Sequence, residues 1–255
     1  MNALNYILLG VVQGLTEFLP VSSSGHLVIF QSILPGVNEP GIILEAFLHA
    51  GTLLSVIYFF RKTFFRKNIK YWILICISTI PAVLVGLFLN DHAEKLFTNI
   101  RVVGVALLIT GFINFATGKI RSKIRESVAF EKFNMKDISN SLIIGVFQAV
   151  AIVPGISRSG STIFAGRKLG LSKNDAAQFS FLMSIPAILG ANAFEFVTSN
   201  KINSDFNYLY LIGFIFSFLS GVIAIKIVIR FLETAKYEYF SFYVFIVGVL
   251  VLIIS

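Results

Sequence analysis

The sequence is poor in charged residues, in acidic residues above all, and in cysteine. Asp, Glu, Lys and Arg together make up 13% of the 255 residues, about half of the roughly 25% that is usual in soluble domains. Hydrophobic residues make up 56%, and the mean hydropathy is +0.84. This balance excludes a soluble globular enzyme and predicts an integral membrane protein. The single cysteine, Cys76, excludes an intrachain disulfide.

Lysine and arginine are absent before Arg61, so no secretory signal peptide with a basic start is expected. Elsewhere three segments carry fourteen basic residues, and the three segments between them carry only three. The basic segments are 61–70, 119–136 and 226–236, and the others are 35–40, 90–101 and 199–207. The positive-inside rule places the first group in the cytoplasm. The net charge of +8 is therefore a topology signal. A contact with anionic lipids is left open, and no nucleic-acid partner is expected.

Six hydrophobic runs are long enough to cross a bilayer, and two further runs are interrupted. The six predicted spans are 41–60, 70–89, 101–118, 175–197, 208–229 and 238–254. Segments 3–34 and 139–169 are apolar but broken in the middle by Gly, Pro and Ser. Each arm of about 15 residues is shorter than the ~30 Å hydrocarbon core. We expect two helical hairpins that enter and leave on one side; the alternative is an ordinary span followed by a polar loop.

The two interrupted segments contain the same motif. GVVQGLTEFLPVSSSGH at Gly10–His26 and GVFQAVAIVPGISRSGS at Gly145–Ser161 align at one offset, so that Ser22 pairs with Ser157. The loop charges require the first hairpin to enter from outside and the second from the cytoplasm. Broken helices inserted in opposite senses are typical of inverted-repeat membrane proteins, and their tips meet near the midplane.

The predicted fold is an all-α polytopic membrane protein with an inverted-topology repeat. Each half is one re-entrant helical hairpin plus three transmembrane helices. The first repeat is 1–118, and the second is 137–255. The alternating charges of segment 119–136 predict a cytoplasmic interfacial linker between them.

Ionisable and hydroxyl side chains gather at the two predicted tips. Such groups are functional candidates inside a membrane, because unpaired charge is costly there. The first tip contributes Gln13, Glu17, Ser22, Ser23, Ser24 and His26, and the second contributes Ser157, Arg158, Ser159, Ser161 and Thr162. One carboxylate, one imidazole, one guanidinium and several hydroxyls are together suited to phosphoryl chemistry.

Each of these groups has a chemical role that fits phosphate. Arg158 can hold phosphate oxygens through two parallel N–H bonds, which a lysine cannot reproduce. A serine hydroxyl can attack phosphorus if a neighbouring base, either Glu17 or His26, takes its proton. Gln13 and Glu17 are four residues apart and share one helix face. Glu17 together with phosphate oxygens suits Mg²⁺ or Ca²⁺.

The same residues also have structural interpretations. Ser and Gly in membrane segments commonly allow close helix packing. A buried Glu17 can be held by hydrogen bonds alone, and His26 can lie at the interface. Arg158 is the hardest to explain without an anion. Glu45 and His49, four residues apart in the first unbroken span, are expected to pair, and a supporting role at the site and a structural role are equally open.

The stretches QGLTEFLPVSSSGH (Gln13–His26) and PGISRSGSTI (Pro154–Ile163) resemble the motifs of the undecaprenyl-diphosphate phosphatase family, also known as the bacitracin-resistance proteins. Weaker similarity runs through Leu169–Ala191. The resemblance implies a metal-dependent hydrolase of the cell membrane that is open to the extracytoplasmic face. Its reaction removes one phosphate from undecaprenyl diphosphate and regenerates the carrier for peptidoglycan synthesis, on which cell shape depends. It also implies resistance to bacitracin, which captures the diphosphate.

The resemblance gives functional roles by motif position to Glu17, Ser23, His26, Ser157, Arg158 and Thr162. We therefore predict a catalytic set of Glu17, Ser23, His26 and Arg158, a substrate-binding set of Gln13, Ser22, Ser157, Ser159 and Thr162, and a divalent cation, Mg²⁺ or Ca²⁺, on Glu17. Many family members have Glu where this chain has Gln13, and a Gln cannot be an anionic ligand. The expected partners are a polyprenyl diphosphate lipid and the bilayer, and a homodimer is left open.

Two alternatives stay open from the sequence. In the first, water attacks phosphorus directly and Ser23 only positions the reacting groups. In the second, the protein is an inverted-repeat transporter or flippase of an anionic lipid or small organic anion. A transporter needs only the phosphate clamp, whereas the first tip also carries a nucleophile and a base, which favours hydrolysis.

Overall fold

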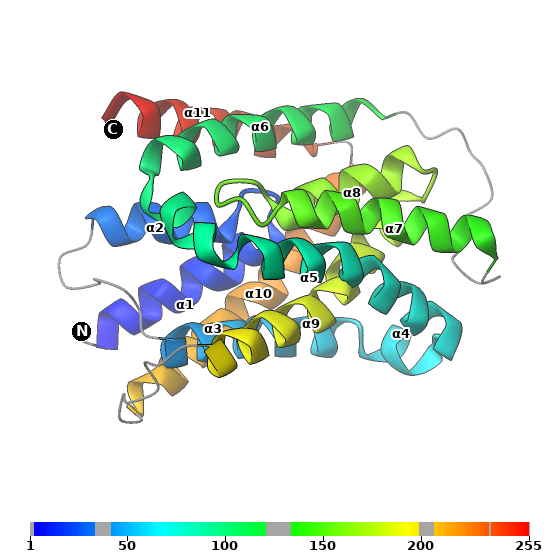
Figure 1. The fold of residues 1–255 in the computed structure, drawn as a ribbon, viewed down its shortest axis with the longest axis horizontal. Coiled ribbons are helices and arrows are strands. Elements are labelled where there is room, and N and C mark those ends of the chain that lie inside the picture. The colour runs from blue at the N-terminus through cyan, green and yellow to red at the C-terminus, as the bar shows by residue number, and fades with distance from the viewer. Residues whose placement is uncertain (1–2, 34–41, 121–133, 199–206, 235, 255) are drawn as a thin grey trace.

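The computed structural model describes residues 3–33, 42–120, 134–198, 207–234 and 236–254, and these residues form eleven helices (Figure 1). The helices are α1 (Ala3–Phe18), α2 (Ser23–Ile33), α3 (Ile42–Phe59), α4 (Arg61–Arg66), α5 (Ile69–Thr98), α6 (Ile100–Lys119), α7 (Met135–Val150), α8 (Arg158–Lys168), α9 (Lys173–Thr198), α10 (Leu209–Glu233) and α11 (Glu238–Ile254). The all-helical prediction is confirmed for this part of the chain.

Four helices are long and apolar enough to cross a membrane: Ile69–Phe88 of α5, α6, Lys173–Phe194 of α9, and α10. Shorter apolar helices are α1, Ile43–Phe59 of α3, and α11. Large apolar side chains also cover the outer surface; Phe88 is 83% exposed and Ile253 is 74% exposed. Water-soluble monomers rarely expose extensive apolar patches. The protein is therefore a multi-pass membrane protein, as its composition predicts.

Both predicted hairpins are pairs of helices. α1 and α7 each have 16 residues, and α2 and α8 each have 11 residues. These lengths correspond to about 24 Å and about 17 Å of helix, less than the ~30 Å core. The chain after each motif continues directly as a helix rather than as a polar loop. Insertion of the hairpins from opposite sides remains a prediction.

Helix packing follows a paired pattern. α1 packs along α10, α7 packs along α5, and α6 packs along α11 (Figure 1). Suppose that α1 corresponds to α7, α5 to α10 and α6 to α11 in the two halves. The contact of α1 with α10 then corresponds to the contact of α7 with α5, and the contact of α6 with α11 corresponds to itself. An internal repeat predicts this pattern. The boundaries of the two repeats, 1–118 and 137–255, remain a prediction, which the pattern supports.

Two segments differ from the sequence prediction. α5 continues to Thr98, so residues 90–98, expected in an outer loop, are helical. No Gly or Pro interrupts this stretch, and the helix ends only at Asn99, whose side chain accepts from the first amides of α6. Segment 61–70, expected as a loop, contains the short helix α4. The predicted linker 119–136 lies mostly outside the described residues.

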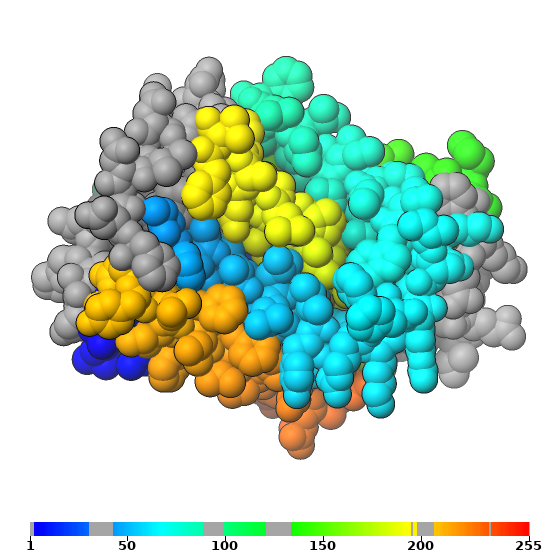
Figure 2. All heavy atoms as spheres, turned by 90° about the horizontal axis from the view of Figure 1, so that it is seen from below, coloured from blue at the N-terminus to red at the C-terminus, as the bar shows by residue number. Residues whose placement is uncertain are grey.

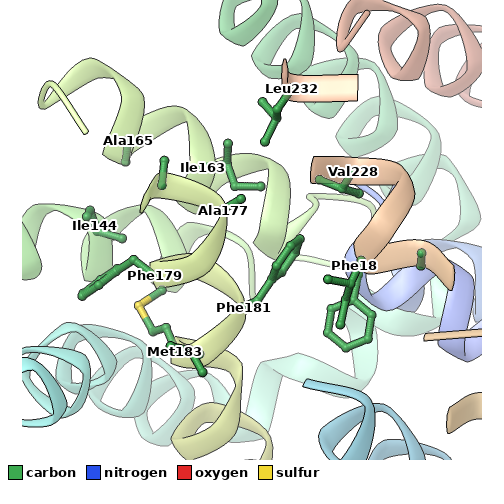
Figure 3. Packing of buried hydrophobic residues seen from close by; sticks show 14 of the residues in the cluster. Phe18, Ile144, Ile163, Ala165, Ala177, Phe179, Phe181, Met183, Val228 and Leu232 are labelled. Carbon is green, nitrogen blue, oxygen red and sulfur yellow. The ribbon is translucent and has the colours of Figure 1, made fainter. Parts of the chain in front are cut away.

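A continuous apolar core surrounds the ends of the motif helices (Figure 3). Phe18, the residue after Glu17, is fully buried. Its ring meets the ring of Phe181 of α9 edge-on, with the ring centroids 5.5 Å apart. Because a packed interior permits little side-chain movement, the last turn of α1 is held firmly against α9.

α1 lies unusually close to α10. A Cβ added at Gly14 would collide with Ser220 Oγ and the Ser217 carbonyl of α10. Small residues permit this approach between membrane helices. The packing interpretation of motif glycines is therefore correct for Gly14.

Candidate active site

Each motif places a turn between two helices. In the first, α1 ends at Phe18, Pro20 follows, and α2 begins at Ser23. In the second, α7 ends at Val150 and α8 begins at Arg158. The second turn includes Gly155 at φ +98°, a backbone conformation that side chains with a Cβ disfavour.

The repeated serine and glycine make the same hydrogen bond at the start of a helix in both motifs. The amide of Gly25 donates to Ser22 Oγ at 3.3 Å, and the amide of Gly160 donates to Ser157 Oγ at 3.1 Å. A serine oxygen that accepts from an amide three residues later is a typical helix N-cap. The shared Ser-x-x-Gly pattern is thus the local signal that starts α2 and α8.

The two tips contact each other, as the sequence predicts. The amide of Gly155 donates to Ser22 Oγ at 3.1 Å, and Ser159 Oγ donates to the Leu19 carbonyl at 3.3 Å. Gly25 faces Gly155 closely enough that an added Cβ would lie 3.0 Å from its Cα. Residues 130 or more positions apart are therefore adjacent.

α6 holds both tips in place. Asn114 Nδ2 donates to the Pro20 carbonyl at 2.5 Å. Thr110 Oγ1 donates to the Gly155 carbonyl at 2.7 Å and accepts from the Ser157 amide at 3.0 Å. These two polar residues, four positions apart in an apolar span, were not predicted as part of the site, although their spacing on one helix face is a usable signal.

A small polar cavity of about 80 Å³ lies where the tips meet. Its lining consists of Thr16, Glu17, Ser22, Ser23, Ser24, Ala151, Ile156, Ser157 and Arg158. Because α2 and α8 both begin at this lining, the positive ends of two helix dipoles face the cavity. Drug-sized ligands need about 300 Å³ or more, so the cavity suits the head of a larger molecule, and its field favours an anion.

Glu17 is the centre of the hydrogen-bond network at the cavity. One carboxylate oxygen, Oε1, accepts from Arg158 Nη2 at 2.6 Å. The other, Oε2, accepts from Ser23 Oγ at 2.8 Å and from Gln13 Nε2 at 3.1 Å. Glu17 is 8% exposed, so the carboxylate is largely removed from solvent and its charge is balanced by the guanidinium. A carboxylate that accepts from a serine hydroxyl is placed to remove the hydroxyl proton.

Arg158 bridges the two halves of the site. Besides its ion pair with Glu17, its Nη1 donates to the Ser180 carbonyl of α9 at 3.2 Å. A guanidinium carries five N–H groups, so these two bonds leave donors that can hold an anion in the cavity that Arg158 lines. The side chain is 16% exposed.

Gln13 lies behind the cavity and joins it to α3. Its side chain is completely buried, and its Nε2 also lies 3.3 Å from His49 Nδ1. Its Oε1 has no hydrogen-bond partner among the described residues. The sequence left a supporting role for His49 open, and the contact with Gln13 connects His49 to the site.

His26 does not line this cavity, although the sequence predicts it as a catalytic residue. Its Nδ1 lies 2.8 Å from the Ser22 carbonyl, and its Nε2 lies 2.8 Å from the hydroxyl of Tyr243 on α11. The Ser22 carbonyl can only accept, so Nδ1 carries a proton. Both ring nitrogens are therefore engaged by neighbours in this structure, and the catalytic role of His26 stays a prediction.

His26 supports an unusual backbone conformation. Ser22 has φ +72°, which costs a non-glycine residue about 1–3 kcal/mol and persists only where several contacts enforce it. Those contacts are the His26 ring on the Ser22 carbonyl and the two amides on Ser22 Oγ. His26 thereby helps to fix the turn that presents Ser23.

Ser159 and Thr162 also lie behind the cavity, where direct substrate contacts were predicted. Thr162 Oγ1 donates to the Arg158 carbonyl at 2.8 Å and lies 2.6 Å from Ser180 Oγ. Ser159 Oγ contacts the Leu19 carbonyl and Ser157 Oγ. Both side chains are about 1% exposed. They fix the positions of the tip and of Arg158, whereas Ser22, Ser23 and Ser157 reach the cavity as predicted.

The oxygen atoms at the site fit a hard divalent cation. Among the described residues, no group of three or more His, Cys, Asp or Glu side chains lies together, so a site built from protein ligands alone is not indicated there. The Glu17 carboxylate and the Ser23 hydroxyl are the oxygens that line the cavity next to each other. Mg²⁺ commonly binds through one or two carboxylates plus the phosphates of its substrate, and this donor set is compatible with that mode.

Known proteins are similar to this chain over nearly its whole length. The family model for bacitracin resistance protein BacA matches residues 6–250. The undecaprenyl-diphosphatase of Halothermothrix orenii is 40% identical, and the alignment covers 100% of this chain and 99% of that protein. The protein of the same name from Methanococcus maripaludis strain C7 is 39% identical, with 96% and 98% covered.

Proposed function

The chain belongs to the bacitracin resistance protein family, and we propose that it acts as an undecaprenyl-diphosphatase at the cavity between its two motif tips. The reaction removes the terminal phosphate of undecaprenyl diphosphate and yields undecaprenyl phosphate and inorganic phosphate. The single observation that carries the assignment to this cavity is Glu17, which pairs with Arg158 and accepts from Ser23 in one buried polar site. The phosphatase name of relatives about 40% identical over nearly their full length supports the reaction.

The substrate is amphipathic, and the molecule offers a matching arrangement. The diphosphate head enters the cavity, where Arg158 and the first turns of α2 and α8 donate hydrogen bonds to its oxygens. The cavity has room for the head alone, so the polyprenyl tail stays in the bilayer beside the apolar outer surface. We place the protein in the plasma membrane with the site open to the extracytoplasmic face.

Ser23 is the proposed nucleophile. Its Oγ attacks the terminal phosphorus while Glu17 takes the hydroxyl proton, and the bond from phosphorus to the bridging oxygen breaks. Undecaprenyl phosphate leaves, and water then hydrolyses the phosphoserine. Direct attack by water remains the alternative, in which Glu17 activates the water and Ser23 orients it.

A divalent cation, Mg²⁺ or Ca²⁺, is the proposed cofactor. Glu17, with Ser23 as a neutral oxygen, would hold it beside the substrate phosphates. When bound, it supplies positive charge that offsets the charge of the diphosphate. Arg158 supplies the other positive charge and orients the terminal phosphate.

The decisive experiment measures phosphate release from a polyprenyl diphosphate by the purified protein in detergent, where transport has no meaning. Ser23→Ala and Arg158→Lys should each lower kcat/KM at least 100-fold, because one removes the nucleophile and the other removes the bidentate clamp. Ser139→Ala is the matched control, since Ser139 is an exposed serine that bonds only to its own helix. Release of no phosphate by the wild-type protein would favour the transporter instead.

A second experiment separates the two mechanisms. Brief incubation with substrate labelled in the terminal phosphate, followed by acid quenching, should trap phosphoserine at Ser23. Residual phosphatase activity in Ser23→Ala above that of an Arg158→Lys, Ser23→Ala double variant would instead support direct attack by water.

A further inference from the structure

We propose that His49 is a positioning residue of this reaction, acting through Gln13 on the Glu17 carboxylate. The inference rests on the proposed function and extends the site to a helix outside both motifs. α3, which carries His49, lies between α9 and α10 on one face of the molecule (Figure 2). Its inner side contacts α1, where Gln13 and Glu17 lie.

The first step is the contact between His49 and Gln13. The amide nitrogen of Gln13 is a donor only, and it lies 3.3 Å from His49 Nδ1. His49 Nδ1 must therefore accept, which requires a neutral imidazole with its proton on Nε2. The same amide nitrogen donates its other hydrogen to Glu17 Oε2 at 3.1 Å. Both N–H groups of Gln13 are thus used, one on each neighbour.

The second step concerns the orientation of the Gln13 amide. The reversed orientation would turn the Gln13 oxygen towards the Glu17 carboxylate, so that two acceptors faced each other. It would also place that oxygen against the Nδ1 lone pair of His49. The Glu17 carboxylate, which can only accept, therefore selects the orientation in which Gln13 donates to it, and His49 Nδ1 accepts the second amide hydrogen and holds the amide there. Gln13 and Glu17 belong to the same helix, whereas His49 lies on α3. The contact with His49 therefore holds the Gln13 amide relative to a second helix.

The third step leads to the reacting atoms. Glu17 Oε2 accepts from Gln13 and also from Ser23 Oγ at 2.8 Å. The hydrogen bond from Gln13 sets the direction in which Oε2 presents its remaining lone pair to the serine hydroxyl. The sequence His49, Gln13, Glu17, Ser23 forms a chain of hydrogen bonds from α3 to the nucleophile. In a buried network, such linked bonds are strongly coupled.

The alternative is that His49 only fills space between α3 and α1. The two roles make different kinetic predictions. Misdirection of Glu17 should lower kcat with little change in KM, because Arg158 and the helix N-termini still bind the phosphate. A packing defect should lower thermal stability and leave the kcat of the folded fraction intact.

The test compares variants that differ at the Nδ1 position. His49→Phe keeps a ring of similar size but removes the acceptor, and His49→Asn keeps an acceptor oxygen close to the place of Nδ1. We expect His49→Phe to lower kcat about 10-fold with KM within about twofold, as the loss of one buried hydrogen bond implies. His49→Asn should recover at least half of the wild-type kcat. If His49→Phe does not fold, His49→Leu makes the same comparison.

Ser55→Ala is the control on the same helix. Ser55 is a buried polar residue that bonds to the carbonyl of Thr52 within α3, and its loss should leave kcat unchanged. Loss of activity in His49→Asn equal to that in His49→Phe, or full activity in His49→Phe, would overturn the inference.

A double-mutant cycle tests whether His49 acts through Gln13. Gln13→Met removes the amide, and in that background His49→Phe should lower kcat less than twofold. A further 10-fold loss there would show that His49 acts independently of Gln13 and would overturn the proposal. The two levels of failure are distinguishable, because the proposed function fails only if the wild-type protein releases no phosphate.

Discussion

Glu17 has three polar partners, one on each of three helices, and each constrains it differently. Arg158 balances its charge, Ser23 donates the proton that it is to remove, and Gln13 orients it. Removal of any one partner leaves the buried Glu17 carboxylate with one hydrogen bond fewer. The free-energy cost of that loss is several times the contribution of one surface hydrogen bond to stability. At the residue scale the site is therefore a single coupled unit rather than a sum of contacts.

The amide at position 13 is the most informative residue for metal dependence. Gln13→Glu would place a second carboxylate about where Nε2 now lies, 3.1 Å from Glu17 Oε2. Two carboxylates at this distance repel each other, and either a shared proton or a bound cation relieves that repulsion. We expect the Mg²⁺ concentration that gives half-maximal phosphate release to fall several-fold. Thermal stability should also rise more steeply with Mg²⁺ than in the wild-type protein, because the ligand binds only the folded state.

Asn99→Asp is the matched control for Gln13→Glu. It also replaces an amide by a carboxylate, but at an exposed N-cap, where Asp is equally favourable. Equal Mg²⁺ responses in the two variants would show that position 13 has no special relation to the cation.

At the scale of the elements, the contact between α1 and α10 decides where the first tip lies. Gly14 permits the two backbones to approach, and Ser217 and Ser220 of α10 fill the remaining space. Because α1 carries Gln13 and Glu17, any displacement of α1 moves the carboxylate away from Arg158.

Gly14→Ala should therefore destabilise the protein by about 1–3 kcal/mol, the usual cost of overpacking. The measurement is thermal or denaturant unfolding in detergent. Gly190→Ala on α9 is the matched control, since an added Cβ there has no neighbour within 4 Å, and it should be neutral or slightly stabilising. Equal stability of the two variants would contradict the close packing of α1 on α10.

At the scale of the whole molecule, helices of the two predicted halves pack against each other, with α1 on α10, α5 on α7 and α6 side by side with α11 (Figure 1). α6 also bonds to both tips through Thr110 and Asn114. The opposite insertion of the halves follows from the loop charges and predicts which side of the membrane each connection faces.

Two capping asparagines test this orientation. Asn68 and Asn99 are both exposed, and each caps the helix that follows it. In a Cys76→Ser background, an impermeant thiol reagent added to intact cells should label Asn99→Cys and leave Asn68→Cys unlabelled until the cells are opened. Labelling of Asn68→Cys from outside would reverse the predicted orientation.

The class of the protein, the two hairpins and the residues of both tips were predictable from the sequence alone. Hydropathy, loop charge and N-cap patterns are local properties, and each is readable within about 20 residues. The duplicated motif also predicted that Glu17 and Arg158 would lie close together, since matching breaks in the two halves of a repeat meet. The C-terminal part of α5, residues 90–98, was predicted as a loop because it is polar, but polar residues can continue a helix when neither Gly nor Pro stops it.

Only the tertiary structure decided which of those polar residues face the cavity. His26, Ser159 and Thr162 lie on the predicted helices, but their side chains bond to Tyr243, to the Leu19 carbonyl of the other tip and to Ser180, respectively. Tyr243, the partner of His26, lies 217 residues away, and Ser180 and His49 belong to other helices. Their contacts depend on the angle and depth at which packed helices meet, which the sum of many weak side-chain contacts determines. A local sequence pattern does not contain information about these long-range contacts. The reactive groups were therefore predictable from the sequence, whereas their hydrogen-bond partners depend on how the helices pack.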